Sequence, residues 1–395
     1  MITTFRGYER PDGLVGVRNH IVVMAVADCA EPVARMIADG VEGAVAISQH
    51  HGCIAGGMVA NTLIGVGKNP NVAAVLLVGM GCEGMSVDSL GNAIKESRKP
   101  TNWISIQKLG GTCNAVTEGK GIVKAMLEEV RGLKRKRFGI SKLVVGVKCG
   151  GSDTTNGLAG NPAVGVAVDM LVDAGGAVLM GEPEEAIGAE GPLSKRAIRE
   201  EVRERIYRMI GDEEKRCSIP GVQTELMCKG NVEGGLTTIE EKSLGAIYKS
   251  GSRPIKGVLE NSDNLLERVP EKGGLYLQDG THLEPMTMSS MAAAGVQLIV
   301  FITGRGGTFG HAIVPMIKVT GNSDTYFRMK DDMDINASTI IEGKESVEAV
   351  GQRIFNKVIE VASGRLTRGE ILGYDNFSVF QRDPRLDVLL GIGQS

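Results

Sequence analysis

Residues 21–48 read IVVMAVADCAEPVARMIADGVEGAVAIS. An apolar run at 21–28 is followed by an amphipathic segment at 31–41 and by a second apolar run at 43–48. Short unbroken apolar runs are typical of strands buried on both faces, and the segment between them has the spacing of a surface helix. A strand, a helix and a strand in this order predict a parallel sheet covered by helices.

The same alternation extends over most of the chain. We predict further strands at 71–79, 102–107, 142–148, 176–181, 273–279, 296–304 and 316–321. We predict further helices at 84–97, 114–133, 191–216 and 346–364. A basic segment, RGLKRKR, separates two such series, and 395 residues exceed the length at which one core keeps growing. The sequence therefore predicts an α/β protein of two α/β domains, at 1–137 and 138–395, with mainly parallel sheets flanked by helices.

The composition argues against several classes of protein. The net charge is −3 and the pI is about 6.1, so nothing favours binding to nucleic acid or to an anionic membrane surface. The N-terminus lacks the apolar core of a signal peptide, and no segment has the length and apolarity of a membrane span. We therefore expect a cytoplasmic protein whose seven cysteines are metal ligands or core residues and not disulfides.

Residues that can bind metals follow several predicted strands. Ligands in open α/β sheets bind beyond the carboxyl ends of the strands, where such residues would meet. The turn SQHHGC places His50, His51 and Cys53 together, although the chain has only 5 histidines and 7 cysteines. Cys82 and Cys149 also follow strands and have glycine neighbours, which suits reactive, exposed thiolates.

The other four cysteines are interpreted differently. Cys29 and Cys113 also follow predicted strands, but a buried core cysteine is the simpler interpretation of each. Cys217 and Cys228 follow helical or loop sequence and are assigned no role. Three cysteines therefore enter the functional hypothesis.

The spacing of these residues indicates the kind of metal site that they could form. No C-x-x-C pair occurs, so the ligands would have to come from distant strand ends, which suits a catalytic site better than a structural one. Thiolates and imidazoles favour iron or zinc over magnesium, and the carboxylates of Glu182 and Glu185 leave Fe(II) or Mn(II) open. Three thiolates at one site could instead hold an iron–sulfur cluster.

The segment CKGNVEGGLTTIEEKSLG, at 228–245, contains a helix start. Thr237 or Thr238 can cap the helix, with Glu240 or Glu241 completing a capping box. The glycines before it leave backbone N–H groups that could bind a carboxylate at the helix N-terminus. A plain capped helix is the alternative.

Several long motifs occur in order along the chain: GYERPDGLVGVRN, GMGCE, KCGGSD followed by Asn161 and Pro162, GEPEE, KGNVEGGLTTIEEKSLG, FITGRGGTFG and PMIKVTGN. On these motifs the chain resembles the altronate/galactarate dehydratase family over essentially its whole length. The beta subunit of (2R)-sulfolactate sulfo-lyase belongs to the same family and shares the second half of the pattern.

The chain departs from the family pattern in two places. Family dehydratases usually begin with a further small domain of the SAF type, so we expect a separately encoded small subunit or none. They also tend to carry a histidine where Gln49 stands and a tyrosine where His51 stands. Cys53 and Cys82 match the dehydratase branch and not the sulfo-lyase branch, which favours a hydroxyl leaving group.

The resemblance implies elimination across C2–C3 of a 2-hydroxy acid, aided by a divalent metal, most simply Fe(II). A base removes the C2 proton, the C3 substituent departs, and the enol becomes a 2-keto acid. The developing enediolate needs a metal or a cationic clamp, and a hydroxide leaving group needs an acid. A sulfite-releasing lyase is the nearest alternative, and a non-catalytic metal-storage or scaffold subunit is the more distant one. We also expect a homo-oligomer.

The family pattern assigns roles to residues as hypotheses. The proposed metal ligands are His50, His51, Cys53, Cys82 and Cys149. The proposed catalytic residues are His51, Glu182, Glu185 and Lys318, with the glutamates as bases or further ligands. The proposed substrate-binding residues are Ser152, Asp153, Asn231, Arg305 and Asn322. Arg305 and Lys318 would hold the substrate carboxylate, and His51 could be a ligand or an acid–base group.

Overall fold

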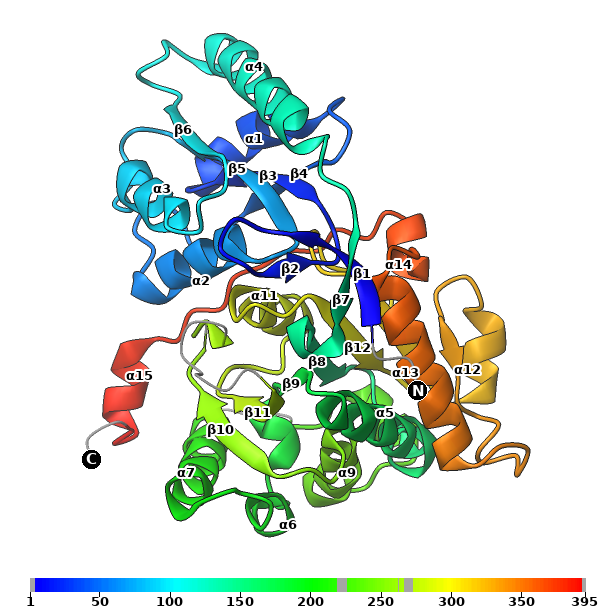
Figure 1. Cartoon of the computed structure of the whole chain (residues 1–395). Coiled ribbons are helices and arrows are strands. Elements are labelled where there is room, and N and C mark those ends of the chain that lie inside the picture. The colour runs from blue at the N-terminus through cyan, green and yellow to red at the C-terminus, as the bar shows by residue number, and fades with distance from the viewer. Residues whose placement is uncertain (1–3, 219–225, 262, 266–272, 393–395) are drawn as a thin grey trace.

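The structure is a computed structural model that describes residues 4–218, 226–261, 263–265 and 273–392. These residues form three sheets, two of which are parallel and flanked by helices (Figure 1). The predicted fold class is therefore confirmed, and every predicted strand is present. None of the described helices has the length and apolarity needed to cross a membrane.

The first parallel sheet lies in the N-terminal part of the chain, at the top of Figure 1. Its strands, in spatial order, are β4 (Ala44–Ser48), β3 (His20–Ala25), β5 (Val72–Gly79) and β6 (Thr101–Ser105). Its helices are α1 (Glu31–Ala38) and α4 (Thr112–Val130) on one face and α2 (Gly57–Lys68) and α3 (Val87–Lys95) on the other. Every residue of β5 is buried because this central strand is covered on both faces.

The second parallel sheet contains seven strands in the part of the chain that the structure describes. In spatial order they are β10 (Ile255–Leu259), β11 (Gly274–Gln278), β9 (Ala177–Met180), β8 (Val144–Cys149), β12 (Leu298–Ile302), β13 (Met316–Thr320) and β14 (Ile335–Asn336). One face packs against α5 (Asn161–Asp173), α7 (Glu200–Cys217) and α13 (Val347–Ala362), and the other packs against α11 (Glu284–Ala293).

A small antiparallel sheet, which the sequence did not predict, joins the two parts. It consists of β2 (Val15–Gly16), β1 (Thr4–Glu9) and β7 (Lys136–Gly139). The remaining described elements are η1 (Asp28–Ala30), η2 (Ile140–Lys142), η3 (Asn156–Gly160), η4 (Pro183–Ala186), α6 (Glu190–Ser194), α8 (Lys229–Glu233), α9 (Ile239–Ala246), η5 (Ile247–Ser250), α12 (Ser323–Arg328), α14 (Arg368–Ile371) and α15 (Pro384–Leu389).

The two parallel sheets are held together by a shared apolar core and by buried amides. Helix α2 packs on α11, and one hydrophobic cluster combines residues of both parts. A Cβ atom on Gly65 would lie only 2.5 Å from the carbonyl oxygen of Ala293, so glycine permits this approach. Asn69 donates to the carbonyls of Ala292 and Val296 at 2.7 and 2.9 Å. The contact is therefore both close-packed and specified by hydrogen bonds.

The predicted single helix at 191–216 is wrong in its first half. The chain forms α6, leaves the helix, and starts α7 at Glu200. Between them the backbone pairs with β10, because Ile255 donates to the carbonyl of Arg196 at 2.8 Å and Ile198 donates back to Ile255 at 3.0 Å. The guanidinium of Arg196 also donates to Ser250 Oγ at 2.9 Å. These tertiary hydrogen bonds outweigh local helix propensity.

Both parallel sheets contain a point at which the strand order reverses. In the first sheet β4 lies on one side of β3 and β5 on the other, and in the second β9 and β12 flank β8 in the same way. Ligands bind beyond the carboxyl ends of strands at such points. The residues after β3, β4 and β5, and those after β8, β9 and β12, are therefore the ones to examine.

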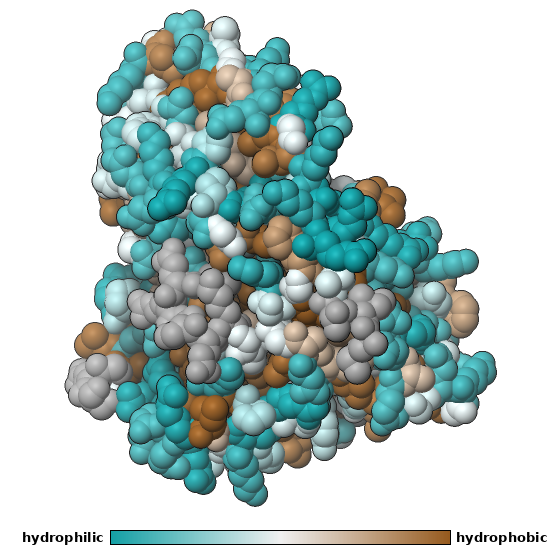
Figure 2. Space-filling view, viewed as in Figure 1, coloured by the Kyte–Doolittle hydropathy of each residue, from teal (hydrophilic) through white to brown (hydrophobic). Residues whose placement is uncertain are grey.

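Hydrophilic residues predominate on the face of the molecule drawn in Figure 2, particularly over the N-terminal part. Hydrophobic side chains reach this face in small separate groups. This face of the described residues therefore offers no broad apolar patch.

Candidate active site

Cys149 is the last residue of β8 and is almost fully buried. Its thiol donates to Oδ1 of Asn161, at the start of α5, over 3.3 Å. Lys249 Nζ donates to the sulfur, also over 3.3 Å. Burial and the nearby Glu185 raise the pKa of Cys149, so the group is a neutral thiol at pH 7.

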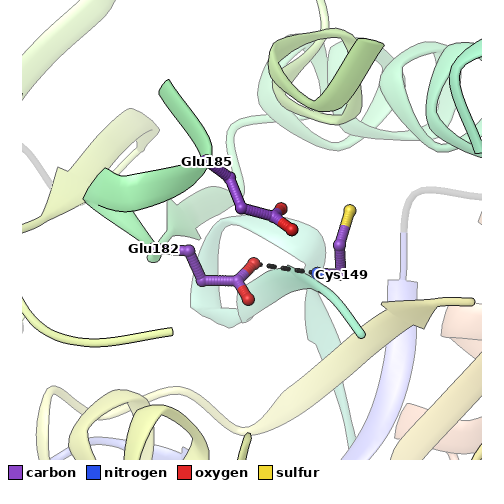
Figure 3. A group of neighbouring side chains, drawn as sticks. All are labelled: Cys149, Glu182 and Glu185. Atoms are coloured by element: carbon purple, nitrogen blue, oxygen red, sulfur yellow. Dashed lines mark hydrogen bonds between the residues drawn. The ribbon is translucent and has the colours of Figure 1, made fainter. Parts of the chain in front are cut away.

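Glu182 lies in the turn between β9 and η4, and Glu185 lies in η4, beside the end of β8 (Figure 3). Glu182 has a left-handed backbone, with φ of +71°, which costs a non-glycine residue about 1–2 kcal/mol. Its carboxylate accepts hydrogen bonds from Cys149 N at 2.9 Å and from Lys148 Nζ at 2.6 Å. These contacts offset the strained conformation and fix the carboxylate beside the thiol.

Three lysines surround the two carboxylates. Lys249, in η5, lies 2.5 Å from Glu185 Oε2 and 3.2 Å from Glu182 Oε2. Lys242, in α9, lies 3.3 Å from Glu185 Oε1, and Lys148 is paired with Glu182. Because Lys148 and Lys249 are fully buried, each ammonium depends on these carboxylates for its charge. The group of Cys149, Glu182, Glu185, Lys148, Lys242 and Lys249 is called the lysine–glutamate cluster below.

The two glutamates of the cluster titrate in opposite directions. Burial and the neighbouring Glu185 raise the pKa of Glu182. Burial would also raise the pKa of Glu185, but Lys249 and Lys242 outweigh it and hold that pKa below its usual range. Two carboxyl groups with separated pKa values suit separate roles as acid and base.

Cys149, Glu182 and Glu185 form a group that could hold a metal ion, since their ligand atoms all lie within 4.8 Å of one another (Figure 3). A thiol and two carboxylates are a suitable donor set for a transition metal. However, Nζ of Lys249 contacts all three donors. A metal bonded at about 2.0–2.3 Å would have to displace this ammonium and deprotonate the thiol. The ammonium group of Lys249 thus occupies the position that a metal ion would take.

Four of the predicted substrate-binding residues lie together beyond β8. Ser152 and Asp153 follow the strand, and Asn231 Nδ2 donates to the carbonyl of Ser152 at 2.8 Å. Asn322 Nδ2 donates to Asp153 Oδ2 at 2.8 Å. Residues distant in sequence thus form one polar group at the point where the strand order reverses.

Arg305 and Lys318 lie on the other side of this point. Arg305 N donates to the carbonyl of Gly151 at 2.8 Å, and its exposed guanidinium lies 3.5 Å from Glu233. Lys318, on β13, donates to the carbonyl of Gly307 at 2.8 Å, and burial lowers its pKa. The guanidinium of Arg305 is therefore exposed but paired with Glu233, which an anionic ligand would have to displace, whereas Lys318 is bound to the backbone.

A cavity of about 320 Å³ opens beside the lysine–glutamate cluster. Its lining includes Ser152, Asp153, Asn161 and Lys242. Asn161 contacts Cys149 and Lys242 contacts Glu185, so these two side chains connect the cavity with the buried cluster. A cavity of this size suits a small ligand.

The histidine loop lies in the other part of the molecule. His51 Nε2 lies 2.7 Å from the carbonyl of Val379, and exposed His50 lines a different cavity. Cys53 and Cys82 are exposed and follow β4 and β5. The structure thus separates Cys149 from the other predicted metal ligands: in the described chain, Cys149 lies in the group with Glu182 and Glu185.

The predicted helix start at 237–238 is confirmed. Thr238 Oγ1 accepts from Glu241 N, and Glu241 accepts from Thr237 N at 2.8 Å. The helix presents Lys242 to the lysine–glutamate cluster, which the sequence analysis missed together with Lys148 and Lys249. The sequence indicated the helix start but not the burial of these lysines. A buried lysine cannot be told from a surface lysine in the sequence until its carboxylate partner is known.

These features define an α/β enzyme with a charged, buried cluster at the edge of a parallel sheet. The family described as D-galactarate/altronate dehydratase, C-terminal, matches residues 140–384. The family described as D-galactarate dehydratase/altronate hydrolase, second domain, matches residues 7–131. The chain belongs to the galactarate/altronate dehydratase family and is a lyase.

Three relatives illustrate the range of the family. The beta subunit of (2R)-sulfolactate sulfo-lyase from Chromohalobacter salexigens is 34% identical, over 95% of this chain and 96% of its own length. Altronate dehydratase from Bacillus subtilis is 32% identical, over 96% of this chain and 78% of its own. Galactarate dehydratase (L-threo-forming) from Escherichia coli is 31% identical, over 92% and 73%.

Proposed function

We propose that the chain is a hydro-lyase that removes water across C2–C3 of a sugar acid of the altronate or galactarate kind, giving a 2-keto-3-deoxy acid. The observation that carries this proposal is the cavity beside the lysine–glutamate cluster, where Lys242 joins a polar lining to paired acids. The relatives named altronate and galactarate dehydratase support the substrate class.

The cluster contains the groups that such an elimination requires. Removal of the C2 proton creates negative charge next to the substrate carboxylate, and fixed cations stabilise that charge. Lys242 and Lys249 are such cations, held in place by the two glutamates. Ionised Glu185 is assigned as the base, and Glu182, with its raised pKa, as the group that delivers a proton to the departing hydroxide.

Substrate recognition is assigned to the polar group beyond β8. Arg305 offers an exposed guanidinium that can bind a carboxylate through two parallel hydrogen bonds. Ser152, Asp153, Asn231 and Asn322 offer donors and acceptors for sugar hydroxyls. Lys318 is assigned as a second contact for the substrate carboxylate. In this role its ammonium would leave the carbonyl of Gly307 and bind the substrate.

A sulfo-lyase acting on (2R)-sulfolactate, with release of sulfite and pyruvate, is the second candidate. One observation favours it: the sulfo-lyase subunit is 34% identical over 95% of this chain, and the two dehydratases above are 31–32% identical. The same base and cations would serve, because both reactions begin at C2. Under this alternative a second subunit completes the enzyme.

Fe(II), or alternatively Mn(II), is proposed as the metal. The donor set of Cys149, Glu182 and Glu185 supports a transition metal, but Lys249 stands in its place. The chemistry above therefore rests on the lysines and glutamates alone. Iron bound elsewhere on the chain remains compatible with it.

The test is an anaerobic assay for 2-keto acids with altronate, galactarate and sulfolactate, each with and without added Fe(II) and any small subunit encoded alongside. If a sugar acid is turned over and Glu185→Gln abolishes this turnover, the result supports the hydro-lyase. Sulfite release from sulfolactate alone would replace it with the second candidate. No turnover of any of the three acids would contradict both.

A further inference from the structure

Four cysteines of the N-terminal sheet follow its four strands, one after each strand. Cys29 follows β3, Cys53 follows β4, Cys82 follows β5 and Cys113 follows β6. All four are free thiols with exposed side chains. Because the strands are parallel, their carboxyl ends meet at one edge of the sheet.

Cys29, Cys53 and Cys82 follow the three strands at the point where the strand order reverses. Their loops are tied together, since Gly52 N donates to Asp28 Oδ2 at 3.2 Å and Gly84 N donates to the carbonyl of Cys53 at 2.8 Å. These hydrogen bonds join the loop after β4 to the loops after β3 and β5. The three cysteines therefore share one ligand-binding edge.

The thiols themselves are close. The thiols of Cys53 and Cys82 both lie close enough to the thiol of Cys29 to interact with it. Cys113 follows β6, the edge strand beyond β5.

The backbone conformation of these loops favours exposed thiols. Gly52 and Gly81, which precede Cys53 and Cys82, have positive φ values of 69° and 113°. Such turns are accessible to glycine and bring the following thiol out of the sheet. Exposed thiols on rigid turns are poor core residues but good ligands.

We infer that Cys29, Cys53 and Cys82 bind an iron–sulfur cluster. Thiolates as sole ligands select zinc, copper(I) or iron–sulfur clusters. One tetrahedral metal bonded to sulfur at about 2.3 Å would need sulfurs about 3.8 Å apart. Among the described residues, the sulfur atoms of these three cysteines do not all lie within 4.8 Å of one another. A wider spacing fits a cluster, in which each thiolate binds a different iron.

Three thiolates leave one coordination position of the cluster open, as in catalytic metal sites. The inferred ligands differ from the predicted ones. Cys29, interpreted as a core residue, is exposed and enters the site, and buried Cys149 leaves it.

The experiment uses the full chain, purified anaerobically and reconstituted with ferrous iron and sulfide. We expect bound iron, acid-labile sulfide and broad visible absorption. Loss of an outer-shell partner alone weakens metal binding by about 10- to 100-fold, so each of Cys29→Ala, Cys53→Ala and Cys82→Ala should reduce bound iron at least about tenfold. Cys113→Ala, on the same sheet edge, should retain the cluster.

Three results would overturn the inference: zinc without sulfide, a Cys29–Cys53 disulfide in the anaerobic protein, or loss of the cluster in Cys113→Ala. The last would indicate four ligands and no open position. Because these readouts do not need turnover, a cluster without activity would contradict only the proposed function. Activity without a cluster would contradict only this inference.

Discussion

The ammonium of Lys249 lies 3.3 Å from the sulfur of Cys149, between that sulfur and two buried carboxylates. An internal cation thus neutralises a site whose donors would otherwise attract a metal ion. The cation is supplied by η5, one hundred residues after the cysteine in the chain.

Removing this ammonium should destabilise the protein. In Lys249→Met, Glu182 and Glu185 lose a buried partner, and breaking a buried ion pair typically costs about 3–5 kcal/mol. Thermal unfolding should show a marked fall in Tm. The double variant Lys249→Met/Glu185→Gln should recover part of the loss, because it also removes an unpaired charge. Lys344→Met, at the exposed pair with Glu342, should change Tm little.

Replacement of Cys149 distinguishes a neutral thiol from a metal ligand. Cys149→Ser keeps a donor for Asn161 and an acceptor for Lys249, so kcat/KM should stay within about tenfold of the wild type. Cys149→Ala removes both contacts and should cost more, about 100-fold by analogy with loss of one active-site hydrogen bond. Equal, complete loss in both variants would indicate that a thiolate–metal bond is required.

Arg305→Lys should weaken substrate binding. Lysine keeps the charge but cannot form two parallel hydrogen bonds to a carboxylate, so KM should rise by about tenfold while kcat changes less. Steady-state kinetics on the acid that is turned over provide the measurement. Arg328→Lys, an exposed arginine of α12 paired with Asp324, is the matched control and should leave KM unchanged. A fall in kcat alone would contradict a binding role.

The stability effect of Glu213→Gln should depend on pH. Burial and the nearby Glu184 raise the pKa of Glu213 from 4.5 to about 7. A carboxyl group whose pKa is higher in the folded state than in the unfolded state contributes stability. This contribution is fully present below the unfolded pKa and is lost as the pH rises through 7. The wild type should therefore lose up to about 3 kcal/mol relative to the variant between pH 4.5 and 8.

Measuring Tm of both proteins at pH 5 and at pH 8 checks this prediction for Glu213. The difference in Tm, variant minus wild type, should be larger at pH 8. A constant difference would show that Arg216, which lies 2.9 Å from Glu213, keeps the carboxyl group ionised throughout.

Two helical glycines should respond oppositely to alanine. Gly65→Ala places a methyl group against Ala293 and should lower the free energy of unfolding by about 1–3 kcal/mol. Gly121→Ala, on α4, meets no atom within 4 Å and should raise it by about 0.5–1 kcal/mol. Tm measured for both variants checks the prediction. A stable Gly65→Ala would contradict a tight α2–α11 contact.

The strands were predictable because their signal is local. β5 and β12 are unbroken apolar runs, and their burial on both faces requires such runs. β1 and β7 were missed because they are short, partly polar strands that pair across more than 120 residues, which no local pattern encodes. The break at Ala197 was missed for the same reason, since it depends on Ile255.

The candidate site was predictable as a set of strand ends, but its partners were not. Glu182 and Ser152 follow apolar runs, and the rule for parallel sheets brings them together. Lys249 lies in helical sequence that resembles a solvated surface, and only the three-dimensional contact with Glu185 shows that it is buried. Cys29 was misjudged because a cysteine after a strand is usually covered by the following helix.

The pairing of β1 with β7 has a consequence for how the gene can change. β1 and β7 lie side by side and antiparallel. The chain between them therefore leaves this small sheet and returns to it at neighbouring positions. The coding region for the four-stranded sheet could be exchanged, as a block, for that of a relative. Recombination at these two points would yield chimaeras in which one partner contributes the cysteine edge and the other contributes the lysines.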